Sequence, residues 1–208
     1  NISTEGGEED GYDRRTFNLR TGASIVEGIS VDFNLRHSRT DTEFDATNFL
    51  TPAGVPQIPV DSDNTAEKNI WMGGGRLTWD MFGGGLTHVI GGNFNDTTQS
   101  STDEFGTVTY DNGRDRFFYL GTARLSMPEA GMRHIFSGLA ETERETFTPS
   151  GGFNDGATRE RERDAYAFEY RGEYFDRFFP TASVRRDEND TFADFTTWKT
   201  GLSVDLRE

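Results

Sequence analysis

The chain has 208 residues, a formal net charge of −15 at pH 7, no cysteine and 18 phenylalanines. So negative a chain argues against a nucleic-acid partner, whose phosphates it would repel. No apolar run reaches the roughly 18 residues of a transmembrane helix, so none is expected. Residues 1–7 show no basic-then-apolar signal peptide.

Most of the chain alternates between apolar and polar residues with a period of two, which predicts β-strands rather than helices. The clearest run begins at Ile29, where apolar side chains take the odd positions as far as Leu35. Nine strands are expected, in chain order at Arg14–Ala23, Ile29–Thr42, Lys68–Met81, Leu86–Asn95, Arg114–Met127, Met132–Phe147, around Asp164–Tyr174, at Pro180–Arg186 and at Phe192–Leu206.

The strand around Asp164–Tyr174 indicates what kind of sheet this is. Tyr166, Phe168 and Tyr170 share one parity, and Glu169 and Arg171 have the other. In a soluble sandwich the apolar face would be mainly aliphatic and the strand shorter. This strand is about 15 residues long, more than the ~10 that cross a tilted bilayer. A charged face opposite an aromatic face suits a wall between water and lipid.

The expected connections alternate in length. Short turns fall at Ser24–Gly28, Phe82–Gly85, Pro128–Gly131 and Asp176–Phe179. Longer loops fall at Asp45–Glu67, Asp96–Gly113 and Thr148–Thr158, with a medium one at Asp187–Thr191. Outer-membrane barrels have this arrangement, with tight periplasmic turns and long extracellular loops.

The fold class expected is therefore all-β, an antiparallel transmembrane β-barrel. Because single-chain barrels have even strand numbers and every edge in lipid must be paired, we expect residues 1–208 to be about 8–9 strands of one larger barrel domain. The outer face is expected to carry Phe17, Phe33, Trp71, Trp79, Tyr119, Tyr166, Phe168, Tyr170, Trp198 and Leu202. The inner face is expected to carry Arg20, Arg36, Arg116, Arg124, Glu169, Arg171 and Lys199.

Three stretches carry a resemblance to a known family. They are Glu9-Asp10-Gly11-Tyr12 leading into a strand, Asp-Thr-Glu-Phe-Asp at Asp41–Asp45, and the last strand pair Ser183–Leu206, with Asp190-Thr191-Phe192 and Thr196-Thr197-Trp198. Together they resemble the middle barrel of TonB-dependent outer-membrane receptors, and most nearly that of the vitamin B12 (cobalamin) transporters.

This resemblance implies a 22-stranded barrel in the bacterial outer membrane, with a plug domain that is not in this sequence. It further implies energised import of a scarce ligand, cobalamin or a siderophore, driven by the TonB complex through that plug. Outer-membrane lipid and lipopolysaccharide are the surroundings to be expected. A passive porin or structural barrel, and a soluble all-β binding module, remain as alternatives.

No catalytic motif points to an enzyme. His37, His88 and His134 lie on three separate strands, and the glycine triplets at 73–75 and 83–85 do not precede helices. Glycines that let strands bend or pack closely explain them better. The alternating charges of Arg159–Asp164 predict a solvated, self-paired face, with contact between the arginines and lipopolysaccharide phosphates as the alternative.

A calcium site is the remaining candidate. Asp61-Ser62-Asp63-Asn64 begins like an EF-hand loop, but the required glycine is replaced by Ala66. The resemblance to cobalamin transporters implies calcium ligands at Asp10, Asp45 and either Asp61 or Asp63, although Phe44 stands where those transporters tend to have Tyr. The alternative is that so acidic a chain scatters carboxylates over all its loops.

Overall fold

The computed structural model describes residues 11–47 and 59–206. Its strands are β1 (Tyr12–Val26), β2 (Ile29–Thr47), β3 (Pro59–Met81), β4 (Leu86–Asp103), β5 (Gly106–Met127), β6 (Met132–Ser150), β7 (Arg159–Tyr174), β8 (Phe178–Asn189) and β9 (Phe195–Val204). Two single 3-10 turns, η1 (Phe82–Gly84) and η2 (Pro128–Ala130), join strands. No α-helix occurs in the described ranges, so none there is long and apolar enough to cross a membrane.

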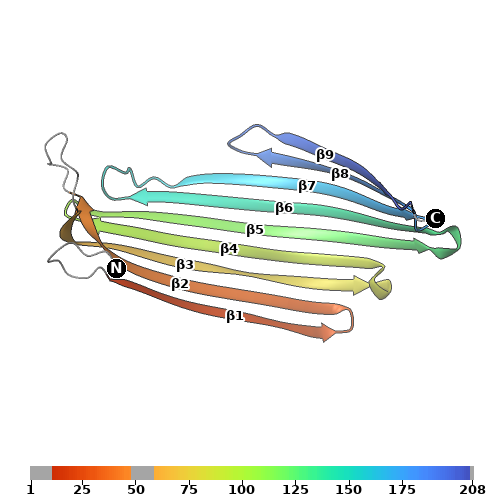
Figure 1. Ribbon diagram of the computed structural model, residues 1–208, viewed down its shortest axis with the longest axis horizontal. Coiled ribbons are helices and arrows are strands. Elements are labelled where there is room, and N and C mark those ends of the chain that lie inside the picture. The colour runs from red at the N-terminus through yellow and green to blue at the C-terminus, as the bar shows by residue number, and fades with distance from the viewer. Residues whose placement is uncertain (1–10, 48–58, 207–208) are drawn as a thin grey trace.

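The strands form one antiparallel sheet in which spatial order equals chain order, from β1 to β9. β1 and β9 therefore lie at opposite edges (Figure 1). Every strand pairs with the next, and the β1–β2, β3–β4, β5–β6 and β7–β8 turns lie at one end of the strands, on the right in Figure 1, whereas the two-residue β4–β5 turn lies at the other end. We call the first of these the short-turn end and the opposite one the long-loop end. The expectation of nine antiparallel strands is confirmed.

The pairing register confirms the two predicted faces. Residues directly opposite each other on neighbouring strands project to the same side of a sheet. Tyr119 lies opposite Ala140, which lies opposite Tyr166. Following such pairs from β1 to β9 puts all ten predicted outer residues on one side, here called the aromatic face. The seven predicted inner residues lie on the other side, the polar face.

Burial is inverted relative to a water-soluble protein. Apolar side chains of the aromatic face are exposed, with Phe168 at 50% and Trp198 at 75%. The buried ionised residues Glu141, Glu143 and Asp187 lie on the polar face, Asp187 at only 2% exposure. In the described part of the chain the one buried hydrophobic residue is Ala165, and the aromatic face meets no second sheet. Apart from Ala165, no hydrophobic residue of the described chain is therefore fully buried by packing.

At three of the four turns at the short-turn end a glycine takes a positive φ, whereas in the β7–β8 turn Phe175 and Asp176 do so. Gly28 has φ +79°, which a side chain would strain, and a Cβ there would lie 2.6 Å from the Asp80 carbonyl oxygen. The Gly28 carbonyl accepts a 2.7 Å hydrogen bond from the Asp80 amide, so this turn docks onto β3. At η2, Gly131 takes φ +61° immediately after Pro128–Ala130. The turns predicted at Phe82–Gly85 and Pro128–Gly131 are confirmed.

Two predicted loops are largely wrong. Residues 96–113 are strand except for Glu104 and Phe105, because β4 continues to Asp103 and β5 starts at Gly106. Asp111-Asn112-Gly113, the last residues of that predicted loop, lie inside β5 opposite Phe147 and its neighbours. Most of the predicted loop Asp45–Glu67 also differs, since β3 already begins at Pro59. Threonine and serine side chains pair across these extensions, as in the 2.8 Å hydrogen bond between the Thr102 and Thr107 hydroxyls.

Aromatic rings cover glycines on the aromatic face. A Cβ on Gly73 would lie 2.8 Å from the ring of Phe94, and one on Gly92 would lie 2.9 Å from Phe117. The ring of Tyr119 similarly lies over Gly121, and its hydroxyl hydrogen-bonds His88 Nδ1 at 2.7 Å. Glycine is required wherever a neighbouring ring lies flat on the sheet. The glycine triplet 73–75 therefore serves packing within β3, as expected.

Candidate functional site

The polar face of β5–β8 carries a network of ion pairs. Glu141 on β6 binds Arg116 of β5 on one side and Arg185 of β8 on the other, the latter at 2.5 Å. Arg185 also binds Asp187 at 2.9 Å. The Glu141 side chain is only 4% exposed, while the two arginines keep about a third of their surface in solvent. The Glu141 carboxylate thus joins β6 to both β5 and β8.

A second carboxylate extends this network toward the long-loop end. Glu143 binds Arg114 at 2.5 Å and Arg163 at 3.2 Å. Arg163 also approaches Asp187, at 4.0 Å. Each buried carboxylate is therefore shared between arginines of different strands, which satisfies its lone pairs and offsets the cost of removing it from water.

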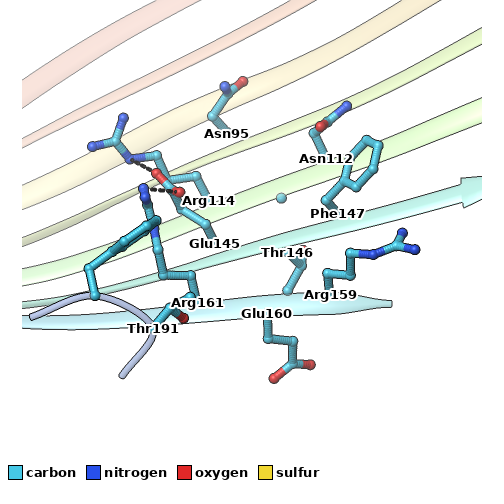
Figure 2. A pocket seen from close by; sticks show the side chains of 12 residues that line it. Asn95, Asn112, Arg114, Glu145, Thr146, Phe147, Arg159, Glu160, Arg161 and Thr191 are labelled. Carbon is cyan, nitrogen blue, oxygen red and sulfur yellow. Dashed lines mark hydrogen bonds and ion pairs between the residues drawn. The ribbon is translucent and has the colours of Figure 1, made fainter. Parts of the chain in front are cut away.

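A recess of about 470 Å³ lies beyond this network, at the long-loop end of the polar face. Figure 2 shows Arg114 and Arg161 converging on Glu145, with Asn95 and Asn112 on its far side. Arg114 Nε lies 3.6 Å from Glu145, and Arg161 also binds this carboxylate. The Arg114 fork donates to Glu143 and the Arg161 fork to Glu145, so both guanidinium groups are fixed beside an open space that Asn95 and Asn112 also line. Such a lining suits a ligand rich in oxygen acceptors.

The loop between β8 and β9 closes one side of the recess with Thr191 and Phe192. The Phe192 ring lies 5.8 Å from the Arg161 guanidinium, a cation–π contact. The Asp190 amide donates to the Glu162 carbonyl at 3.2 Å, which fastens the loop to β7. A hydrogen bond from the Thr191 hydroxyl lowers the pKa of the Asp190 carboxyl below its ordinary value.

The charged run Arg159–Asp164 is divided between the two faces. Arg159, Arg161 and Arg163 lie on the polar face, and the latter two bind Glu145 and Glu143. The intervening carboxylates Glu160 and Glu162 lie on the aromatic face, and Glu160 points away from Arg159 in Figure 2. The run is ion-paired, but its partners lie on β6 and in the preceding loop rather than within the run. Contact between these arginines and lipopolysaccharide phosphates stays a prediction.

The three histidines stay structural, as expected. All lie on the aromatic face, where His37 stacks on Trp71 at 4.1 Å and hydrogen-bonds Asn69 at 2.8 Å. His134 hydrogen-bonds the Tyr170 hydroxyl at 3.0 Å, as His88 does that of Tyr119. The three histidines lie on separate strands, each beside an aromatic ring, and they do not meet in one group.

The four predicted calcium ligands are only partly described. Asp10 and the side chain of Asp61 lie outside the described residues, and Asp63 is exposed on β3. Asp45 lies where the β2–β3 register shifts between Phe44 and Ala46. Among described residues, no group of three or more metal-binding side chains occurs, but that range omits two of the four. The calcium site therefore stays a prediction.

The sequence signalled the recess poorly. Arg159 and Arg161 stood out as part of a charged run, but nothing joined them to Asn95, Asn112 or Phe192. Partners such as Arg116 and Glu141 are 25 residues apart, and Arg185 and Glu141 are 44 apart. Only the register of four strands shows that they meet.

This geometry is one antiparallel sheet with a polar and an aromatic face, which is the pattern of a transmembrane barrel wall. No protein-family model matches the chain, and no curated protein matches it. Solved structures do match in fold. The siderophore receptor PirA from Acinetobacter baumannii aligns with a TM-score of 0.74 and 10% identity, over 97% of this chain and 32% of that one.

Two further solved structures have the same fold. PiuA, a siderophore receptor from Acinetobacter baumannii, aligns with a TM-score of 0.63 at 11% identity, over 96% of this chain and 40% of that one. The RagAB peptide transporter aligns with a TM-score of 0.62 at 12% identity, over 94% and 30% respectively. The chain thus spans about a third of each and has the antiparallel transmembrane β-barrel fold, as a segment of about nine strands.

Replacing Glu141 by Gln is expected to destabilise the folded protein by about 2–3 kcal/mol, because Arg116 and Arg185 lose their shared partner. The matched control is Glu169→Gln, on the same face, whose carboxylate binds Arg171 at 2.5 Å but is 40% exposed. That exposed pair should contribute less than about 1 kcal/mol. Denaturant unfolding of the full-length protein in detergent measures both, and equal losses would contradict a special role for the network.

Proposed function

We propose that this chain forms part of the barrel wall of a TonB-dependent receptor in the bacterial outer membrane. The receptor imports a scarce ligand, such as cobalamin or a siderophore, without covalent catalysis. The observation that carries this proposal is the inverted burial, with Phe168 and Trp198 exposed on one face and Glu141 and Asp187 buried on the other. Only a sheet between lipid and an aqueous interior gains from that arrangement.

The edges of the sheet support a larger assembly. β1 and β9 are unpaired on their outer sides within the described chain. Unpaired backbone groups are costly in lipid, so further strands must close the barrel. The remaining strands, the plug and the contact with the TonB complex belong to the part of the receptor outside this chain. Lipid and lipopolysaccharide surround the aromatic face.

The recess at the long-loop end favours a receptor over a passive porin or a structural barrel. Its arginines and amides converge on one space of about 470 Å³ and are held by ion pairs and a fastened loop. Preorganised donors of this kind bind a ligand, whereas a passive pore needs no such constellation. A soluble binding module is disfavoured by the exposed aromatic face, since large apolar patches promote association in water.

Placing arginine on the aromatic face should prevent stable insertion. Phe168→Arg is expected to cost about 2–4 kcal/mol, because it moves a charge into the hydrocarbon layer. Ser137→Arg is the matched control, since Ser137 lies on the polar face opposite Glu169 and the new cation remains in water. Folding of the full-length protein into lipid vesicles distinguishes them. Unimpaired folding of Phe168→Arg would remove the lipid-facing assignment.

Import is tested in cells. The full-length protein is expressed in a Gram-negative strain that lacks its own receptors for cobalamin and ferric siderophores. It should restore uptake of labelled cobalamin or of a ferric siderophore. Uptake should disappear when TonB is inactivated, because the energy arrives through the plug. A passive porin would give uptake that is independent of TonB, and a structural barrel would give none.

Calcium binding is proposed on the resemblance to cobalamin transporters, with Asp10, Asp45 and either Asp61 or Asp63 as ligands. Calcium takes several oxygens at about 2.4 Å, and clustered carboxylates repel one another until it binds. In a calorimetric titration of the full-length receptor, a double variant with Asp10→Ala and Asp45→Ala should lose affinity for calcium. Equal affinity in both proteins would exclude these residues.

A further inference from the structure

The polar face has a second hollow, which is separate from the recess and borders the ion network at Arg116. It has a volume of about 390 Å³ and lies over β1–β4, with Phe118 of β5 at one side. We call it the glycine basin. Its centre is a row of directly paired residues that runs across four strands: Arg20, Asn34, Gly74 and Asn93.

Gly74 makes the hollow. Neighbouring strands lie about 4.8 Å apart, so a glycine between Asn34 and Asn93 leaves a gap about 10 Å wide. A Cβ on Gly74 would lie 2.9 Å from the Gly92 carbonyl oxygen and 3.0 Å from Asn93 Cβ. The strands approach too closely for a side chain, and the floor of the basin is therefore bare backbone.

Arg20 gives the basin its charge. Within residues 11–46 and 62–206, whose side chains the structure describes, Arg20 and Arg36 have no ion-pair partner. Arginines of β5–β8, such as Arg116 and Arg185, are by contrast bound to carboxylates. In the basin itself the one carboxylate, Asp32, is already bound to Arg76 at 3.0 Å. An unneutralised guanidinium directly opposite the Asn34 amide is suited to an incoming anion.

Phe118 gives the basin an apolar edge. Its ring lies under the Arg116 guanidinium, 5.0 Å away, and Arg116 is itself fixed by Glu141. The ring covers Gly91, where a Cβ would lie 2.6 Å from it. Because both faces of the ring are covered, its edge is what lines the basin next to the glycine floor, and a flat ligand would meet it edge to face.

We propose that the glycine basin binds an organic carboxylate with a flat, unsaturated body. The carboxylate is held by the Arg20 fork, with Asn34 and Asn93 donating further hydrogen bonds. The flat body rests on the backbone at Gly74 and against Phe118. This inference rests on the proposed function, because the polar face must line the barrel interior, and it requires that the plug leave the basin open to solutes.

The test is a calorimetric titration of the native full-length protein in detergent with benzoate. Benzamide, which has the same shape without the charge, is the control ligand. Benzoate should bind and benzamide should not. Arg20→Gln should weaken benzoate binding about tenfold or more, as expected for loss of a charged hydrogen-bonding partner.

Arg14→Gln is the matched control variant. Arg14 also lies on the polar side of β1 but about 20 Å from Arg20 along the strand, so its loss should leave benzoate affinity unchanged. Equal effects of the two substitutions would overturn the inference. No binding by the native protein, for instance because a carboxylate from elsewhere in the full-length chain already holds Arg20, would overturn it as well. If uptake depends on TonB but benzoate does not bind, the basin proposal is wrong and the proposed import function is unaffected.

Discussion

An unbroken pairing register is the constraint on which the rest of this structure depends. Each strand keeps its apolar side chains on one face only if its pairing does not slip by one residue, since a slip would exchange the two faces. The register runs without interruption between β3 and β4, from Thr65 to Met81. A register shift between β1 and β2 falls beside the turn, between Ser24 and Val26. Irregular pairing is thus confined to strand ends, where neither face must be maintained.

The two faces require different means of cohesion. The aromatic face gains stability only from its surroundings and from rings laid over glycines, such as Tyr119 over Gly121. The polar face cannot rely on apolar burial, and its strands are joined by shared carboxylates instead. Glu141 contacts arginines of β5 and β8 at once, so it links strands that are not direct neighbours in the sheet. Hydrogen-bonded sharing is what makes buried charge tolerable here.

Sequence alone predicted the strands, the tight turns and both faces, because each depends on a local period of two. It failed at residues 96–113, which were predicted to form a loop but are strand except for Glu104 and Phe105. The physical reason is that both faces of a strand are wet beyond the lipid, so apolar alternation disappears while pairing continues. Hydrogen bonds such as that from Thr98 to Asp111 hold this extension, and polar pairs leave no periodic signal. The ion network was equally hidden, since its members converge only through the register.

Charge is distributed unevenly over the polar face, and this divides it into two regions with different properties. Over β5–β8 arginines and carboxylates neutralise each other, and Glu143 and Asp187 are almost fully enclosed. Side chains fixed in that way make a rigid wall. Over β1 and β2 the cations Arg20 and Arg36 have no such partners in the described chain. A cation that is left unpaired costs little while water solvates it, and it remains available to an anion that displaces the water. The polar face over β5–β8 is therefore neutralised pair by pair, whereas Arg20 and Arg36 leave it positively charged over β1 and β2.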